Sequence, residues 1–141
     1  MFGIIVSAVA GASMSVQGVL NTRLGEKIGI FESNVLCQGI AFFLAVIVML
    51  FFGKGNLGGL TEVNKTYLLG GVLGIVITVT VMLGINKLSP TYAISVILIT
   101  QLLVAALIDF FGLFGTEKVA FGITKVAGLA FMIGGILLIK K

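Results

Sequence analysis

Residues 35–52, VLCQGIAFFLAVIVMLFF, hold no charged side chain and decide the fold class of this chain. A helix of this length and composition can cross the hydrocarbon core of a bilayer, which takes about 20 mostly apolar residues, or about 17 at the short limit. Comparable apolar stretches lie on both sides of it, at residues 2–24, 67–86, 92–111 and 123–139. The sequence therefore predicts five transmembrane helices, of which the second and the fifth are the shortest.

The overall composition supports the same prediction. Hydrophobic residues make up 59% of the 141 residues, and the mean hydropathy is +1.26. No globular domain can hide that much apolar surface from water. The first stretch lacks a basic region before its apolar part and an Ala-x-Ala cleavage site, so we expect a retained helix and not a signal peptide. We expect an all-α integral membrane protein, with residues 1–141 forming a single membrane domain built as a five-transmembrane-helix bundle.

Several classes of function are excluded by what the sequence lacks. The nine basic residues, which give a net charge of +4, are scattered at helix ends as interfacial anchors, so we expect no nucleic-acid partner. Without His, and with Cys37 as the single cysteine, the chain can assemble no metal, haem or disulfide site, and we expect no cofactor. Cys37 is interpreted as a small packing residue. No carboxylate pair or activated nucleophile is visible, so we expect no enzyme.

The basic residues are distributed almost evenly between the two faces of the membrane, so they hardly predict the orientation of the chain. Five spans place the two termini on opposite faces. The face of the N-terminus receives four basic residues, Lys54, Lys65, Lys118 and Lys125. The other face receives five, Arg23, Lys27, Lys87, Lys140 and Lys141. Because the excess of Lys and Arg in short cytoplasmic loops sets orientation, a difference of one leaves two hypotheses. Either the tail lysines or a lipid contact select one orientation, or both orientations coexist.

Coexisting orientations have a structural consequence. Two oppositely inserted copies can associate about a two-fold axis in the membrane plane, which reproduces with separate chains the inverted repeats of larger transporters. We therefore expect an antiparallel dimer, formed with a second copy or with a paralogous chain. The sequence does not tell which face is cytoplasmic.

The first helix carries two stripes at four-residue spacing. A stripe of small residues consists of Ser7, Gly11 and Ser15, and an adjacent polar stripe consists of Ser13, Gln17 and Asn21. Small residues allow another helix to approach closely, whereas amides inside a membrane need hydrogen-bonding partners. For Gln17 and Asn21 two hypotheses remain: interhelical hydrogen bonds without a ligand, or the lining of a substrate path.

The fourth helix repeats this arrangement with Gln101 near its middle and Asp109 two turns later. An unpaired amide in hydrocarbon costs several kcal/mol, so Gln101 must face protein or water and not lipid. We predict that Gln17 and Gln101 line a substrate path, together with Asn21 and Ser13. Weaker candidates are Gln38, Thr78, Thr80 and Thr100, since hydroxyl groups in helices often bond only to their own backbone.

Asp109 is the only acidic residue expected within a span. It lies toward the far edge of the hydrocarbon core, where Lys125 of the next helix comes within plausible reach from the same face. Two hypotheses follow: a structural ion pair between Asp109 and Lys125, or a site at which Asp109 carries a coupling proton or cation.

Two helices carry small residues suited to close contact with a second chain. The third has Gly70 and Gly74 at Gly-xxx-Gly spacing, and the fifth has Ala130 and Gly134 at the same spacing. Either pair is a candidate for the dimer interface, and the sequence does not rank them.

Taken together, these residues resemble a known family. The chain is similar almost end to end to the YdcZ-type branch of the drug/metabolite transporter superfamily. The most specific parts are QGVLNTRLG at residues 17–25, TQ at residues 100–101 and DFFGLFG at residues 109–115. The resemblance implies a half-sized transporter of a bacterial inner membrane, crossing it several times and pairing with itself or a sister chain. Its spans would match one half of larger ten-helix members.

One departure from the superfamily narrows the expected substrate. The small multidrug exporters carry a glutamate in their first helix for exchange of protons against cationic drugs, whereas the polar side chains at this depth here are Gln17 and Asn21. This favours a neutral or zwitterionic small-molecule substrate carried by alternating access. The alternative is a small accessory or scaffold membrane protein, in which the amides only hold helices together.

Overall fold

The described residues of the computed structural model, 1–119 and 122–139, are helical apart from short connectors, and they contain no strand. The five α-helices are α1 (Phe2–Ile28), α2 (Ile30–Phe52), α3 (Leu69–Lys87), α4 (Pro90–Phe111) and α5 (Ile123–Ile139). Three short 3₁₀ helices occupy connectors, namely η1 (Leu57–Thr61), η2 (Lys65–Leu68) and η3 (Leu113–Gly115). The all-α fold predicted from the sequence is confirmed. Lys140 and Lys141, which entered the charge count, lie outside the described residues.

The helices have the length and surface of membrane spans. α1, α2, α4 and α3 together with η2 are long and apolar enough to cross a bilayer, while α5 has 17 residues, the short limit for a span. In each of the four longer spans at most 11% of the most apolar window is buried inside the chain. Bulky side chains such as Phe51 and Phe131 face outward, the latter 83% exposed. Lipid and not water is the solvent that suits this surface.

The packing within the chain forms two compact units, Met1–Lys87 and Leu88–Lys141. The first unit contains α1, α2 and α3, and the second contains α4 and α5. Each unit is described by itself below.

The connection between α1 and α2 is much shorter than the sequence predicts. A connector was expected between residues 24 and 35, but α1 continues to Ile28, α2 begins at Ile30, and Gly29 alone lies between them. Gly29 has φ 103°, a conformation that side-chain-bearing residues rarely adopt. The charged residues of this segment remain helical, and Arg23 Nη1 forms an ion pair with Glu26 Oε2 at 3.0 Å. Gln38 consequently lies in the third turn of α2 and not in its first.

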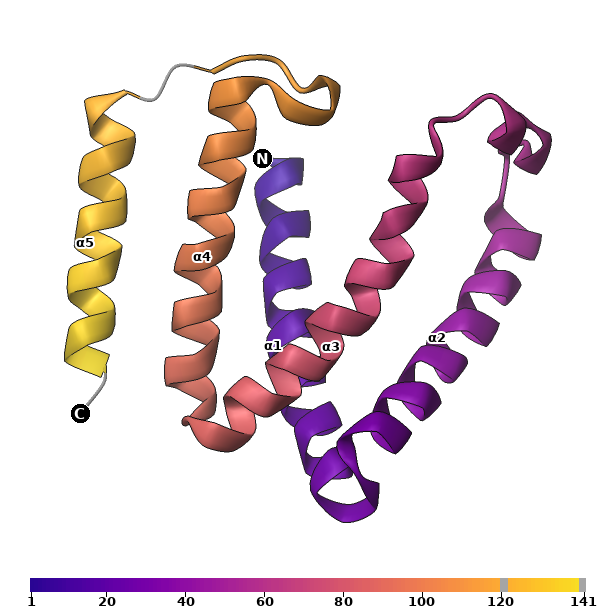
Figure 1. Ribbon diagram of the computed structural model, residues 1–141, viewed down its shortest axis with the longest axis horizontal. Coiled ribbons are helices and arrows are strands. Elements are labelled where there is room, and N and C mark those ends of the chain that lie inside the picture. Colours follow the sequence, from indigo (N-terminus) through magenta and orange to yellow (C-terminus); the bar gives the residue numbers. More distant parts are fainter. Residues whose placement is uncertain (120–121, 140–141) are drawn as a thin grey trace. The chain divides into compact units, whose positions relative to one another are not determined.

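Within the first unit, α3 packs against both α1 and α2, and its C-terminal half crosses α1 (Figure 1). The crossing is close because Gly18 of α1 has no side chain. A Cβ atom at Gly18 would lie 3.0 Å from Ile85 Cδ1 and 3.1 Å from Val81 Cγ1. The buried residues of α1 are Gly18, Asn21, Thr22 and Gly25.

Within the first unit, the small residues of α1 that pack closely are Gly18 and Gly25. The predicted stripe of small residues lies on an exposed part of the helix. Ser7 and Gly11 are exposed, a Cβ atom at Gly11 would meet nothing within 4 Å, and the Ser15 hydroxyl donates to the Gly11 carbonyl of its own helix at 3.0 Å. Contact of this stripe with a second chain stays a prediction.

Gly18 offers a direct test of this crossing. Gly18→Leu should lower the free energy of unfolding by about 1 to 3 kcal/mol, because the added side chain has no room against Val81 and Ile85. Gly11→Leu is the matched control in the same helix and should leave stability nearly unchanged. The measurement is thermal unfolding in detergent followed by circular dichroism. Equal melting temperatures for the two variants would contradict the α1–α3 contact.

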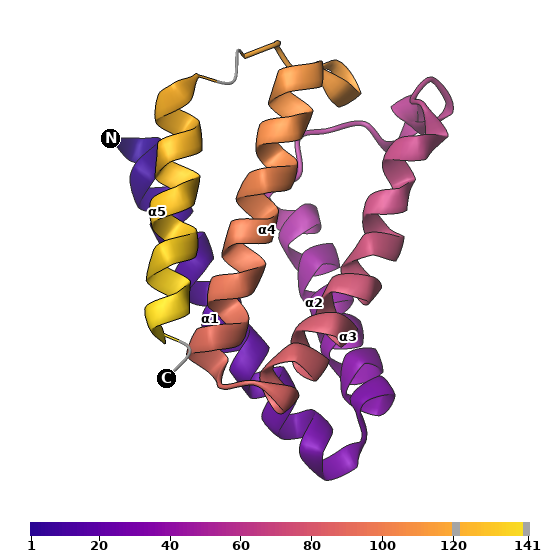
Figure 2. The ribbon, with the colours of Figure 1, turned by 60° about the vertical axis from the view of Figure 1, so that its left-hand side comes forward.

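The second unit is an antiparallel helix pair, in which α4 and α5 run side by side in opposite directions (Figure 2). Ser89 caps the start of α4 by accepting a hydrogen bond from the Tyr92 amide at 3.3 Å, and Pro90 follows at a position where its missing amide is harmless. Gly112 ends the helix in the left-handed conformation, φ 64°, and its amide donates to the Ile108 carbonyl. This pair places Asp109 near the end of α4 and Lys125 in the first turn of α5.

Candidate functional site

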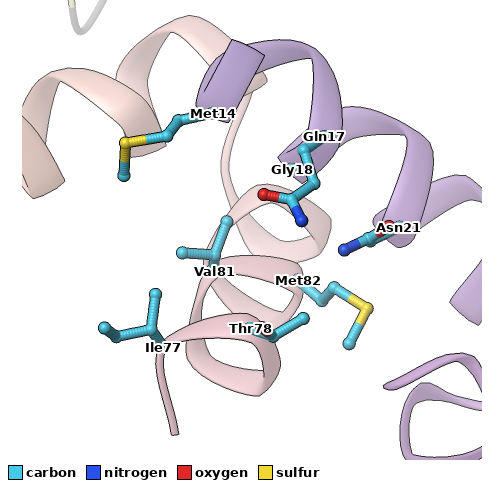
Figure 3. Close-up of a pocket in the computed structure, with 8 residues that line it drawn as sticks. All are labelled: Met14, Gln17, Gly18, Asn21, Ile77, Thr78, Val81 and Met82. Atoms are coloured by element: carbon cyan, nitrogen blue, oxygen red, sulfur yellow. The ribbon is translucent and has the colours of Figure 1, made fainter. Parts of the chain in front are cut away.

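A small cavity lies where α3 crosses α1, and amide groups line it. Its volume is about 50 Å³. The lining residues are Met14, Gln17, Gly18 and Asn21 of α1 and Ile77, Thr78, Val81 and Met82 of α3. Figure 3 shows the amide groups of Gln17 and Asn21 side by side on one face of α1, turned toward α3. Two of the predicted path residues thus meet at one cavity.

Asn21 is both a lining residue and a structural one. It is buried, and its Oδ1 accepts a hydrogen bond from Cys37 Sγ of α2 at 3.1 Å. Its main-chain carbonyl accepts a second hydrogen bond from Ser33 Oγ, also at 3.1 Å. These bonds tie α2 to α1, which corresponds to the interhelical hypothesis for Asn21. Cys37, expected to act only in packing, also serves as a hydrogen-bond donor.

Gln17 differs from its neighbour in having no protein partner. Its side chain is exposed and forms no hydrogen bond with any residue that the structure describes. It also lies on an open face of α1 together with Ser13 and Asn21. The polar stripe of Ser13, Gln17 and Asn21 therefore follows one open face of this helix.

Gln38 and Gly74 contact each other inside the first unit. A Cβ atom built on Gly74 would lie 3.7 Å from Gln38 Nε2, so the amide of α2 covers this glycine of α3. Gln38 is half-buried and does not line the cavity beside Gln17. Gly74, predicted as a dimer contact, is half-buried and has the Gln38 amide of its own chain in van der Waals range, whereas a Cβ atom at Gly70 would meet nothing within 4 Å.

Gln101 lies at the centre of α4, in the second unit, and its side chain is exposed. Among the described residues its side chain has no hydrogen-bond partner. The hydroxyl groups of Thr78, Thr80 and Thr100 bond to their own helix backbone, as sequence considerations led us to expect. Of these three, only Thr78 borders the cavity.

Asp109 and Lys125 line a different cavity, of about 320 Å³, between α4 and α5. The other lining residues are apolar, namely Leu102, Ala105, Ala106, Gly128, Leu129 and Met132. The predicted proximity of the two charges is present, but within the described residues they form no ion pair, since the single pair found is Arg23 with Glu26. The choice between a structural ion pair and a coupling site at Asp109 therefore stays open.

Several polar residues at the α1–α2 contact were not singled out from the sequence. Ser33 and Asn34 are buried, and Thr22 donates to the Gly18 carbonyl at 2.7 Å. The Asn34 Oδ1 atom is buried without a hydrogen-bond partner in the described part of the chain. The available signal was the spacing of Gly18, Thr22 and Gly25, which places three small residues on one face of α1. No group of three metal-ligating side chains occurs among residues 1–119 and 122–139.

Apolar helices with exposed bulky side chains and amides at helix crossings define the class: this is an all-α integral membrane protein. Residues 2–138 match the model of the family described as "Putative inner membrane exporter, YdcZ". The chain belongs to this family, so it is a multi-pass membrane transporter of the inner membrane, and its family is not a class of enzymes. No curated protein and no solved structure matches the chain.

Proposed function

We propose that this transporter carries a neutral or zwitterionic small molecule by alternating access, as an antiparallel dimer of two identical or paralogous chains. The observation that carries the proposal is the side-chain amide of Gln17. It lies on an apolar helix, borders the cavity between α1 and α3, and has no hydrogen-bond partner in the described part of the chain. Within a bilayer such a group must bond to water, ligand or a second protein chain. An amide both donates and accepts, which suits a neutral or zwitterionic substrate.

The size of the cavity supports an assembly of more than one chain. Ligand pockets usually measure about 300 to 1,000 Å³, whereas the cavity beside Gln17 measures about 50 Å³ and has room only for a few water molecules. The adjoining face of α1 beside Ser13 is open. A second chain placed against this face would enclose the polar stripe and complete a substrate site, which is the role that the inverted repeat has in larger transporters.

A scaffold protein without transport activity is the second candidate, and one observation favours it. The bond from Cys37 to Asn21 shows that an amide in α1 holds two helices together. The two candidate functions predict different roles for Gln17. A transporter would use its amide to bind substrate, whereas a scaffold function does not explain an amide that has no protein partner.

Gln17 and Asn21 therefore provide the test. A substrate is first found by thermal shift with neutral and zwitterionic metabolites, because a ligand at 100 times its dissociation constant stabilises by about 2.7 kcal/mol. Gln17→Leu should then keep its melting temperature and lose roughly tenfold to hundredfold in flux of a zwitterionic substrate into proteoliposomes, as expected for one lost hydrogen bond to a charged group of about 1.5 to 3 kcal/mol. Asn21→Leu should instead lower the melting temperature, because Cys37 loses its acceptor.

Met14→Leu is the matched control, since it changes the same cavity without removing a polar group. It should retain normal flux. Full flux in Gln17→Leu would argue for the scaffold and against the proposed substrate path.

A further inference from the structure

We propose that the cavity between α4 and α5 is a binding site for a small zwitterion with an apolar side chain, with Asp109 holding its ammonium group and Lys125 its anionic group. This inference rests on the proposed transport of a neutral or zwitterionic substrate and names the class of that substrate more closely. The lining residues of this cavity all come from the second unit.

The charges carry the first part of the argument. One carboxylate and one ammonium group border the same cavity from two different helices, and they do not contact each other. Asp109 is half-buried and Lys125 is exposed in this chain. Inside a membrane, opposite charges that border apolar side chains pair with each other or with something placed between them. A ligand with one positive and one negative end satisfies both groups at once, whereas a ligand with one charge leaves one of them unpaired.

The volume and the remaining lining set the size and polarity of the ligand. A cavity of about 320 Å³ is at the small end of ligand pockets, which measure about 300 to 1,000 Å³. Ala105, Ala106 and Gly128 provide the space, and Leu102, Leu129 and Met132 provide an apolar wall. A Cβ atom at Gly128 would meet nothing within 4 Å, so the cavity is open at this point. An aliphatic amino acid has the matching chemistry.

The test uses ligands that differ by one charge. L-Leucine carries both charged groups, 3-methylbutylamine lacks its carboxylate, and 4-methylpentanoate lacks its ammonium group. Binding of each to the purified full-length protein is measured by calorimetry, with L-alanine and L-valine as shorter zwitterions. L-Leucine should bind at least roughly tenfold more tightly than either single-charge analogue, because charge-assisted hydrogen bonds are the strong ones.

Two variants assign the two ends of the ligand. Asp109→Asn should remove the advantage of L-leucine over 4-methylpentanoate, and Lys125→Gln should remove its advantage over 3-methylbutylamine. If Asp109 and Lys125 had only a structural role, each variant would change the dissociation constants of all three ligands by the same factor. The proposal is overturned if none of the three amino acids binds, if L-leucine has no advantage over its analogues, or if each variant weakens all ligands equally.

A cavity-filling variant keeps the test decisive if a charge variant fails to fold. Gly128→Leu should weaken L-leucine binding by more than tenfold while both charges remain. Gly71→Leu is its control, since a Cβ atom at that exposed glycine of α3 also meets nothing within 4 Å. Unchanged L-leucine binding in Gly128→Leu would show that the ligand lies elsewhere and would overturn the assignment.

The same chemistry occurs in the headgroup of phosphatidylethanolamine, so the source of the zwitterion is tested separately. L-Leucine binding is compared in nanodiscs of phosphatidylglycerol with and without phosphatidylethanolamine. Competition by the lipid identifies the headgroup as the occupant, and its absence identifies a free solute. Failure of this site and failure of the proposed function remain distinguishable. L-Leucine bound without flux contradicts transport of this ligand, whereas flux of another substrate without L-leucine binding contradicts only the site.

Discussion

If the chain inserts in both orientations, a unique cysteine placed at Leu57 should be labelled in comparable amounts by a reagent added from either side of the membrane. The expectation follows from the distribution of basic residues, five on one face and four on the other, because a difference of one is too small a charge bias to select one orientation. Leu57 is 75% exposed in the longest connector of the chain. The native cysteine is replaced as Cys37→Ser and not by alanine, because its thiol donates a hydrogen bond to Asn21.

Forcing one orientation should then abolish transport. In one variant, Gly55→Lys and Gly59→Lys are combined with Lys27→Gln and Lys87→Gln, which changes the count to six basic residues on the N-terminal face against three. A Cβ atom at either glycine would meet nothing within 4 Å, so both positions accept a side chain. The opposite variant, Lys54→Gln with Lys65→Gln, leaves two against five.

Each variant alone should be inserted in one orientation, accumulate normally and show no flux above background. Coexpression of the two should restore flux, because an antiparallel dimer needs one copy of each orientation. Labelling of the single-site protein from one side only, or full flux from one variant by itself, would exclude the dual-orientation dimer.

The second large effect is expected on the stability of the dimer. The sequence predicts two candidate contact surfaces, one with Gly70 and Gly74 and one with Ala130 and Gly134. In the structure Gly74 is covered by Gln38 of its own chain, whereas a Cβ atom at Gly134 would meet nothing within 4 Å and Ala130 is exposed. The surface on α5 is therefore the better candidate for contact with a second chain.

Gly134→Leu should weaken the dimer roughly tenfold to hundredfold, the equivalent of about 1 to 3 kcal/mol of overpacking at a close helix contact. The monomer fraction is measured by single-molecule photobleaching in liposomes at several protein densities. Gly74→Leu is the informative comparison. It should lower the melting temperature of the chain through Gln38 and leave the dimerisation constant nearly unchanged. The reverse outcome would place α3 in the interface, and monomers in all samples, wild type included, would contradict the dimer altogether.

The composition alone was sufficient for the fold class, and the physical reason is the solvent. A stretch such as residues 35–52 is stable only in hydrocarbon, and there the backbone must satisfy its own hydrogen bonds as a helix. The bounds of α5 and the start of α4 near Pro90 follow from the same rule together with local capping. The turn at Gly29 was missed because charged residues at an interface can remain helical, so the charges of Arg23 and Glu26 gave no signal of a helix end.

The sequence by itself determined which groups had to find partners: Gln17, Asn21 and Gln101 among the amides, and Asp109 and Lys125 among the charges. The cost of burying a polar group in lipid is a property of the residue type and can be derived without coordinates. Only the tertiary structure decided who the partners are. In the structure Asn21 accepts a hydrogen bond from Cys37, and the Gln38 side chain lies beside Gly74. Asp109 and Lys125 line one cavity and form no ion pair with each other. These outcomes depend on which helices pack against each other and at which residues, and a single sequence does not state this. The close crossing of α1 and α3 is an example, because it is possible only where Gly18 has no side chain.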